Sequence, residues 1–199
     1  MPHPEFHTTL QAVKVLCIAD QISVMTAPSS IILVGPTGAG KSSIGRLLAQ
    51  ALQWRFTDLD REIESRVGVC ISTLFTQGNE AYFREQEHLA LRDTIVTPAQ
   101  VLATGAGCVV REENRKLLHN AYVVHLQVPL ASQLKRLQCD RSRPLLQSEN
   151  REQILQEMAR IRAPYYAEVA DLTFCNDGHQ SPRSACAKLL TQIKQNWHD

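Results

Sequence analysis

The sequence contains no long apolar run, and it carries almost no excess charge of either sign. A membrane-spanning helix needs about 18 consecutive apolar residues, and no stretch approaches this length. Lys and Arg together number 21 and Asp and Glu number 20, so the formal net charge is only +1. A general nucleic-acid binder or a protein of anionic membranes normally has a larger basic excess. We therefore expect neither nucleic acid nor a membrane as a partner.

Glycine and proline are also scarce, at 9 residues each in a chain of 199. This scarcity excludes a collagen-like chain and a low-complexity chain. Hydrophobic residues make up 44% and charged residues 21%, which is typical of a compact globular protein. The length suits one domain with a short appendage rather than two full domains.

Cysteine pairs of the C-x-x-C type, which build zinc sites and thioredoxin-like sites, are missing. Several cysteines fall inside apolar runs, where buried free thiols are common, so we expect them to be reduced. The first 20 residues make a poor secretion signal, because they lack a basic start and Lys14 and Asp20 interrupt the apolar region. We expect a cytoplasmic protein. The six cysteines are Cys17, Cys70, Cys108, Cys139, Cys175 and Cys186.

Residues 1–29 differ from the rest of the chain. They include Pro2, Pro4 and Pro28 and have no strong apolar periodicity, so we interpret them as a partly ordered N-terminal extension. An upstream start codon, with Met25 as an equally plausible beginning, would explain them, and a partner-binding helix is the alternative. Residues 30–199 are then expected to form one domain.

From residue 30 onward, short apolar runs alternate with longer helical patterns. Strands too apolar to face water, each followed by a helix, indicate a parallel sheet covered on both faces. Residues 138–151 interrupt this pattern with charged side chains and a proline, which predicts a mobile lid. The expected strands are 31–34, 54–57, 101–104, 122–126 and 172–175, and the expected helices are 41–52, 60–67, 78–94, 111–119, 130–138, 151–168 and 181–197.

The most specific motif is G-x-x-x-x-G-K-S over residues 35–42, placed between a predicted strand and a predicted helix. Glycines allow a tight turn whose N–H groups point at phosphate oxygens, and the helix N-terminus adds its positive dipole end. Lys41 is expected to reach the β- and γ-phosphates, and the Ser42 hydroxyl to bind Mg²⁺. The motif predicts binding of a nucleoside triphosphate.

Two aspartates, Asp58 and Asp60, follow the second predicted strand. Residues two apart on a strand point to the same side, so both should face the carboxyl edge of the sheet, where ligands bind. One carboxylate could hold the water shell of Mg²⁺, and the other could accept a proton from an attacking hydroxyl. Asp60 is also a suitable N-cap for the following helix.

Arginines and a second glycine turn offer further anion-binding groups. Arg84 could bind an anion or pair with a glutamate on its own helix. The turn Gly105–Gly107 could receive an anion on its N–H groups, or it could be an ordinary tight turn. Arg143 lies in the lid, which is either a closing cationic loop or a solvated one. Arg162 could hold a carboxylate in a bidentate contact, or pair with Glu168.

Taken in order and spacing, six motifs closely resemble those of the shikimate kinase family: GPTGAGKSSIGRLLAQAL, FTDLDREIE, FREQE, LATGAG, RPLL and RAPYYAEVADLT. The resemblance covers the chain from Ile31 to the C-terminus. It implies a three-layer α/β/α P-loop kinase fold, similar to nucleoside monophosphate kinases, with a five-stranded parallel sheet of order 2-3-1-4-5. It also implies transfer of the ATP γ-phosphoryl group to the 3-hydroxyl of shikimate, on the route to chorismate and aromatic amino acids.

The resemblance further implies a role for individual residues, with shikimate and ATP as substrates, one Mg²⁺ ion per subunit and a monomeric enzyme. Lys41, Asp60 and Arg143 would be catalytic, with Asp60 as the base. Shikimate would be bound by Asp60, Arg84, Ala106 and Arg162, and Mg²⁺ by Ser42 and, through water, by Asp58. ATP would be bound by Gly38, Ala39, Gly40, Lys41, Ser42, Ser43, Arg136 and Arg143, with Arg136 against the adenine.

Two features depart from the family pattern. The family usually has three consecutive glycines where this chain has Ala106 between Gly105 and Gly107, and it usually begins close to the first strand. Two other functions remain open at this point. One is a P-loop kinase of another polyol acid such as gluconate, although Arg84, Arg162 and Asp60 together suit one carboxylate plus vicinal hydroxyls. The other is a nucleotide-binding regulatory protein without catalysis.

Overall fold

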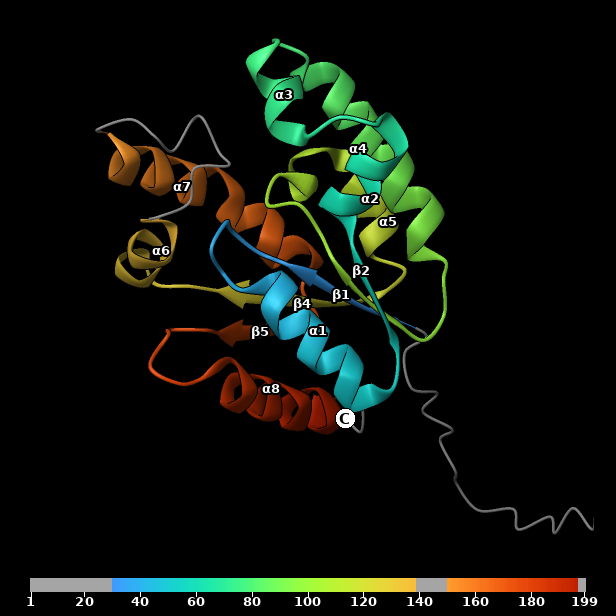
Figure 1. The fold of residues 1–199 in the computed structure, drawn as a ribbon. Coiled ribbons are helices and arrows are strands. Elements are labelled where there is room, and N and C mark those ends of the chain that lie inside the picture. The colour runs from blue at the N-terminus through green and yellow to red at the C-terminus, as the bar shows by residue number, and fades with distance from the viewer. Residues whose placement is uncertain (1–29, 139–149, 197–199) are drawn as a thin grey trace, which may run out of the picture.

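The computed structural model describes residues 30–138 and 150–196 (Figure 1). The expectations for the N-terminal extension, for Cys17 and Cys139, and for most of the predicted lid with Arg143 lie outside these ranges. The strands are β1 (Ser30–Val34), β2 (Arg55–Asp58), β3 (Gln100–Ala103), β4 (Tyr122–Gln127) and β5 (Leu172–Cys175). The α-helices are α1 (Lys41–Leu52), α2 (Leu59–Val67), α3 (Ile71–Thr76), α4 (Glu80–Ile95), α5 (Glu112–Leu118), α6 (Leu130–Leu137), α7 (Arg151–Val169) and α8 (Pro182–Asn196), and Cys108–Val110 forms the short 3₁₀ helix η1.

The five strands form one sheet of order β2-β3-β1-β4-β5, and every pair in it is parallel. The predicted order 2-3-1-4-5 is confirmed, and each strand boundary lies within one residue of its predicted place. Strand β1 is central, and its residues from Ile31 to Val34 are completely buried. Such a strand needs apolar side chains on both faces, which is why its continuous apolar run is easy to recognise in the sequence.

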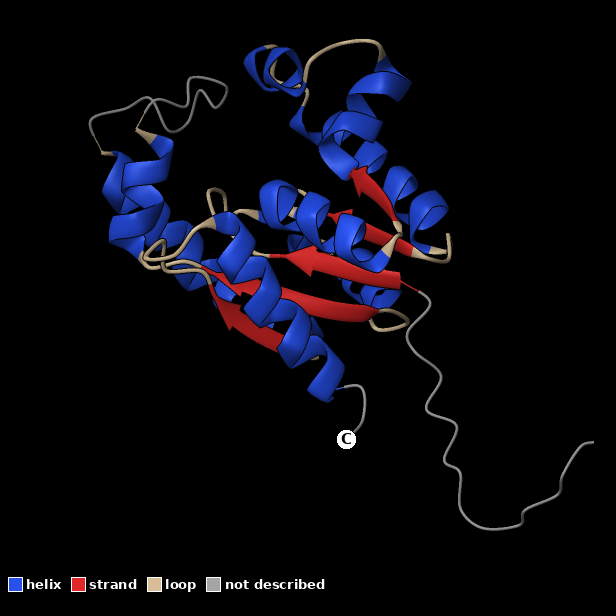
Figure 2. Cartoon of the chain, turned by 60° about the horizontal axis from the view of Figure 1, so that its bottom comes forward, coloured by secondary structure: helices blue, strands red, loops and turns tan. Residues whose placement is uncertain are grey.

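Helices cover both faces of the sheet, as Figure 2 shows. Alternate residues of β1 supply the two hydrophobic cores: Ile31 and Leu33 pack towards α1 and α8, and Ile32 and Val34 pack towards α2, α4, α5 and α7. This alternation follows from the two-residue period of a strand. The predicted three-layer α/β/α architecture is therefore confirmed, and the carboxyl ends of all five strands meet at one edge.

Two helix predictions were wrong in detail. The segment before α4 forms the separate helix α3, which the sequence did not predict, and the chain turns between the two helices at Gly78, whose φ is +73°. Helix α2 begins at Leu59, one residue before its expected start. Asp60 therefore lies inside the first turn and is not the N-cap, since that position belongs to Asp58, whose side chain makes no capping hydrogen bond.

The described cysteines agree with the expectation of free thiols: Cys108 and Cys186 are buried, and Cys70 and Cys175 are exposed. Burial raises the pKa of the Cys108 thiol well above its usual value, so this group stays protonated. In the part of the chain that the structure describes, no helix combines the length and the apolar character needed to cross a bilayer.

Candidate active site

The loop between β1 and α1 (the P-loop, residues 35–40) has the conformation that its glycines permit. Gly38 and Gly40 have φ angles of +76° and +94°, in the left-handed region that favours glycine. Helix α1 begins directly after Gly40, so its unpaired N–H groups face the loop opening. The Lys41 ammonium donates hydrogen bonds to the carbonyl oxygens of Gly35 and Pro36, at 2.8 and 2.9 Å. A positive charge and backbone donors therefore gather at one point.

Ser42 and Asp58 lie together at this point. The Ser42 hydroxyl, in the first turn of α1, donates a 2.7 Å hydrogen bond to Oδ2 of Asp58 at the end of β2. A hydroxyl and a carboxylate are the hard oxygen ligands that Mg²⁺ prefers. Within residues 30–138 and 150–196, no cluster of three His, Cys, Asp or Glu could hold a metal by itself. The pair thus fits a Mg²⁺ ion that also takes phosphate oxygens and water as ligands.

The Asp60 carboxylate points elsewhere. It approaches Gly105, where an added Cβ atom would lie 2.9 Å from Oδ1 of Asp60. The two aspartates do not continue along one strand face as expected, because the chain changes from strand to helix between them. The consequence is a division of roles: Asp58 faces the P-loop serine, and Asp60 faces the second glycine turn.

In the turn Gly105–Gly107, the two glycines leave room for charged side chains. A Cβ at Gly105 would also lie 2.7 Å from Oε1 of Glu87, and a Cβ at Gly107 would lie 2.5 Å from Nη1 of Arg84. Ala106 lies between them, is 6% exposed, and does not have a positive φ angle. Alanine at this position therefore carries no left-handed strain, and the close approaches concern only the two flanking residues.

Arg84 and Glu87 form an ion pair on α4, at 2.8 Å between Nη1 and Oε2, and Arg84 also contacts the exposed Glu80 at 3.2 Å. The helical pairing considered as an alternative for Arg84 therefore exists, and it holds the guanidinium against the glycine turn. Glu87 is 1% exposed, and its Oε1 atom has no hydrogen-bond partner among the residues that the structure describes. Burial raises the pKa of Glu87, against the opposing effect of the Arg84 charge. The sequence analysis missed Glu87.

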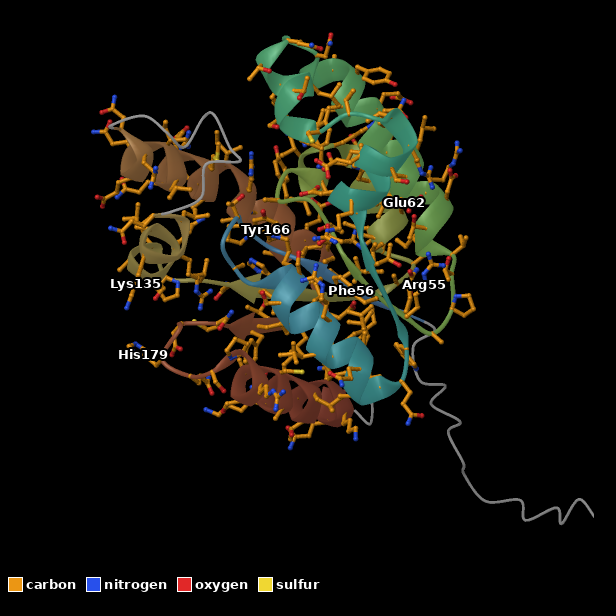
Figure 3. The ribbon with its side chains drawn as sticks, in the orientation of Figure 1. Arg55, Phe56, Glu62, Lys135, Tyr166 and His179 are labelled. Atoms are coloured by element: carbon orange, nitrogen blue, oxygen red, sulfur yellow. The ribbon has the colours of Figure 1, made fainter. Side chains whose placement is uncertain are left out.

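Arg162, on α7, reaches the turn from the opposite side. Its Nη1 donates to the carbonyl oxygen of Ala106 at 3.3 Å, and the neighbouring Tyr166 hydroxyl donates to the same oxygen at 2.7 Å. Tyr166, labelled in Figure 3, is itself a residue of α7, and it is buried. Burial raises the pKa of Tyr166, so its hydroxyl stays protonated and can donate this hydrogen bond. The alternative pairing of Arg162 with Glu168 is wrong, because Glu168 pairs with Arg115 at 2.9 Å.

A cavity of about 520 Å³ unites these groups. Both arginines, both carboxylates and the glycine turn line it, and Thr37 of the P-loop forms part of its wall. Two guanidinium groups suit a carboxylate ligand, because each presents N–H donors in a planar fork. The residues in question are Asp60, Arg84, Glu87, Gly105, Ala106, Gly107 and Arg162.

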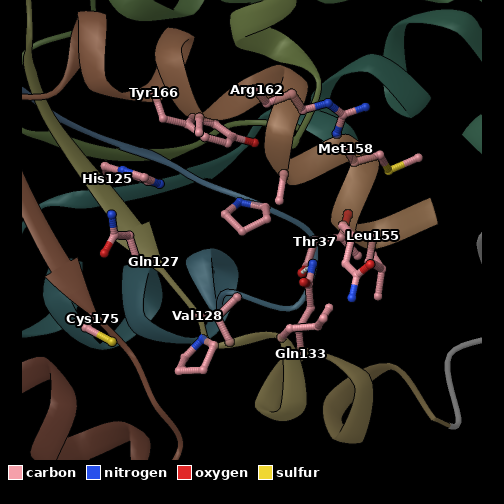
Figure 4. A pocket seen from close by; sticks show the side chains of 16 residues that line it. Thr37, His125, Gln127, Val128, Gln133, Leu155, Met158, Arg162, Tyr166 and Cys175 are labelled. Carbon is pink, nitrogen blue, oxygen red and sulfur yellow. Dashed lines mark hydrogen bonds between the residues drawn. The ribbon is translucent and has the colours of Figure 1, made fainter. Parts of the chain in front are cut away.

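A second cavity of about 470 Å³ lies between the P-loop, α6 and α7 (Figure 4). His125 of β4 lines it and stacks on Tyr166, with the ring centroids 4.7 Å apart. Burial and the nearby Lys41 charge lower the pKa of His125 to about 4, so this imidazole is neutral at pH 7.

Arg136, predicted to lie against the adenine, is anchored beside the P-loop. Its Nη1 donates to the Gly38 carbonyl oxygen at 2.9 Å, and its Nη2 donates to the Asn176 carbonyl oxygen at 3.0 Å. The guanidinium thus joins the P-loop to the segment after β5. Its contact with adenine stays a prediction.

Comparisons with known proteins agree on one family. The shikimate kinase family model matches residues 37–194. Shikimate kinases of Thioalkalivibrio sulfidiphilus and of Xanthomonas campestris pv. campestris are 46% and 41% identical over 172 and 174 residues. These alignments cover 86% and 87% of this chain, and 88% and 96% of the relatives.

Solved structures give the same result. The shikimate kinase from Acinetobacter baumannii in complex with shikimate has a TM-score of 0.81 and 41% identity, with 86% of this chain and 96% of that chain covered. The shikimate kinase from Bacteroides thetaiotaomicron has a TM-score of 0.78 and 29% identity, with coverages of 84% and 99%. A gluconokinase from Sinorhizobium meliloti, at a TM-score of 0.54 and 18% identity over 85% of this chain and 93% of that one, shares the fold alone. The chain belongs to the shikimate kinase family.

Proposed function

We propose that the protein transfers the γ-phosphoryl group of ATP to the 3-hydroxyl of shikimate, on the route to chorismate. One observation carries this proposal: a single cavity joins the P-loop to two arginines and to Asp60. Its chemistry suits a small acid with hydroxyl groups next to a nucleotide. The A. baumannii relative, solved with shikimate, supports the choice of acceptor.

Arg84 and Arg162 bind the shikimate carboxylate in this proposal. They come from α4 and α7, and each is already held by the protein, Arg84 by the Glu87 carboxylate and Arg162 by its bond to the Ala106 carbonyl. Guanidinium groups that are fixed before binding lose little conformational entropy when the substrate arrives. The glycine turn contacts both, with Gly107 against Arg84 and Ala106 against Arg162.

Asp60 serves as the base in this proposal. As the bond between the 3-hydroxyl oxygen and the γ-phosphorus forms, the bond between that phosphorus and the oxygen bridging to the β-phosphate breaks, and the hydroxyl proton passes to Asp60. ADP leaves with the released oxygen. The separation of Asp60 from Asp58, which faces Ser42, supports a division between the substrate side and the metal side.

ATP would be held by Gly38, Ala39 and Gly40 of the P-loop, by Lys41, Ser42 and Ser43 in the first turn of α1, and by Arg143, with Arg136 against the adenine. Ser42, with Asp58 acting through water, would hold Mg²⁺, and a bound Mg²⁺ ion supplies charge neutralisation across the β- and γ-phosphates. We also propose that the enzyme is a cytoplasmic monomer with one such ion per subunit.

A coupled assay of ADP release over shikimate, gluconate and nucleoside monophosphates tests the proposal, with ATP and Mg²⁺ supplied. We expect turnover that depends on shikimate and exceeds that on every other acceptor by at least about 100-fold, the discrimination that matched charged and polar contacts can provide. Preferential turnover of gluconate would replace the proposed acceptor. An absence of turnover with nucleotide still bound would indicate a regulatory protein.

A further inference from the structure

Three consecutive carbonyl groups of the P-loop are each held by a side chain from a distant part of the sequence. The Thr37 oxygen accepts a hydrogen bond from Gln133 Nε2 at 2.8 Å, and the Gly38 oxygen accepts one from Arg136. The Ala39 oxygen accepts one from Asn176 Nδ2 at 2.7 Å. We call Gln133, Arg136 and Asn176 the P-loop brace.

The brace is itself a connected unit. Gln133 and Arg136 lie on α6, and Asn176 directly follows β5. Arg136 donates to the backbone carbonyl of Asn176, and the Ser132 hydroxyl on the same helix donates to that of Asp177. Gln133 is 5% and Asn176 7% exposed, so both amides are shielded from competing water. Figure 4 shows Gln133 and Thr37 at the second cavity.

Peptide geometry explains what the brace can do. In a planar trans peptide, the carbonyl of one residue and the N–H of the next point in opposite directions. Fixing the carbonyls of Thr37 and Ala39 outward therefore aims the N–H groups of Gly38 and Gly40 into the loop. The Ala39 N–H closes a turn on the Pro36 oxygen at 3.2 Å. Inward N–H groups are what a P-loop offers to phosphate oxygens.

The sequence leaves space for this arrangement at Gly40. A Cβ atom there would lie only 2.7 Å from the Nδ2 atom of Asn176. The glycine before Lys41 therefore permits a left-handed backbone and also admits the amide group that holds the preceding carbonyl. Any side chain at this position would push Asn176 away from Ala39.

We infer that Gln133 and Asn176 are positioning residues, which with Arg136 preset the P-loop for the triphosphate without touching the reacting atoms. This inference rests on the proposed function in that the ligand of the loop is a nucleotide. Because each bond is buried and aligns one peptide unit, losing one should weaken nucleotide binding and leave shikimate binding unchanged.

The experiment measures the dissociation constants of MgADP and of shikimate by titration calorimetry, with thermal unfolding in parallel. The variants are Asn176→Ala and Gln133→Met, which keep the fold's apolar packing but remove one donor each. We expect MgADP to bind about five- to tenfold more weakly, the effect of one net hydrogen bond, with shikimate affinity within about twofold. Asn176→Asp, of equal size, should bind MgADP more weakly than Asn176→Ala, because its carboxylate repels the Ala39 carbonyl.

Asn114→Ala is the matched control. Asn114 is a fully buried asparagine whose amide donates to the Cys108 carbonyl at 2.9 Å, outside the brace. The Asn114→Ala variant should have a lower unfolding temperature and an unchanged affinity for MgADP. If both brace variants bind MgADP like the wild type, or if they lose MgADP and shikimate affinity equally and in step with stability, the inference fails. A wild-type protein that binds MgADP but does not phosphorylate shikimate would overturn the proposed function, and the brace would still be judged by the variants.

Discussion

The glycine turn gives a prediction whose direction follows from the close surroundings of Gly105 and whose size follows from the general cost of overpacking. In Gly105→Ala, the new methyl group would lie 2.7 Å from a Glu87 oxygen and 2.9 Å from an Asp60 oxygen. These distances are shorter than any normal contact, so at least one carboxylate must move. Forcing an extra methyl group into a packed site costs about 1–3 kcal/mol. Applied to the transition state, this corresponds to a loss of about 5- to 150-fold in kcat/KM for shikimate.

Gly107→Ala tests the other side of the same turn. Its methyl group would lie 2.5 Å from Arg84 Nη1, so it should displace the cation that binds the carboxylate and raise the shikimate KM. Gly105→Ala should instead lower kcat, because it displaces the base. Ala106→Gly is the control, and we expect its shikimate KM to be unchanged or lower.

The assay is steady-state kinetics with shikimate and ATP each varied, beside thermal unfolding of every variant. The ATP KM should stay within about twofold throughout, since the Gly105–Gly107 turn does not contact the P-loop amides. Wild-type kcat/KM for shikimate in both alanine variants would refute the reasoning, and so would a loss confined to the ATP KM.

Three further predictions concern single side chains. Arg162→Lys should raise the shikimate KM at least about tenfold and spare that of ATP, since an ammonium cannot replace the planar fork; an unchanged shikimate KM would place the carboxylate elsewhere. Asp60→Asn should lower kcat by about 100-fold or more, with little change in nucleotide affinity measured by titration; an effect mainly on the ATP KM would make it a nucleotide-side residue. Because the folded-state pKa of His125 is lowered from 6.5 to about 4, its contribution to stability is complete above pH 6.5 and is lost as the pH falls towards 4. Between pH 8 and pH 5, the free energy of unfolding measured with denaturant should fall by about 2 kcal/mol more for the wild type than for His125→Phe. The same pH dependence of this free energy in both proteins would contradict the prediction.

The central strands β1, β3 and β4 were predictable because they are buried on both faces and therefore appear as apolar runs, whereas the edge strands β2 and β5 are only partly buried. Helix α3 was not, because six residues are too few to display a helical period. The N-cap of α2 is Asp58 and not Asp60, a difference of two residues, because the exact end of a helix is weakly encoded in the local sequence. The P-loop was recognisable because its chemistry depends on local sequence.

The rest of the site depends on contacts between distant residues. Glu87 was missed because a buried carboxylate on a helix has the same sequence pattern as an exposed one. The Arg162–Glu168 pair could have been excluded, since residues six apart lie about 120° apart around a helix and do not face each other. That Gln133 and Asn176 meet at the P-loop follows only from the tertiary packing of α6 and of the segment after β5 against this loop.

The central claim is that one cavity brings a carboxylate-bearing alcohol to the γ-phosphate of ATP, and identification of the product tests it most directly. Purified protein would be incubated with ATP, Mg²⁺ and shikimate, and the product analysed by phosphorus–proton correlation NMR. We predict that ADP and shikimate phosphorylated at the 3-hydroxyl form in equal amounts. Phosphate on a different hydroxyl, or ADP formed without a phosphorylated shikimate, would contradict the account.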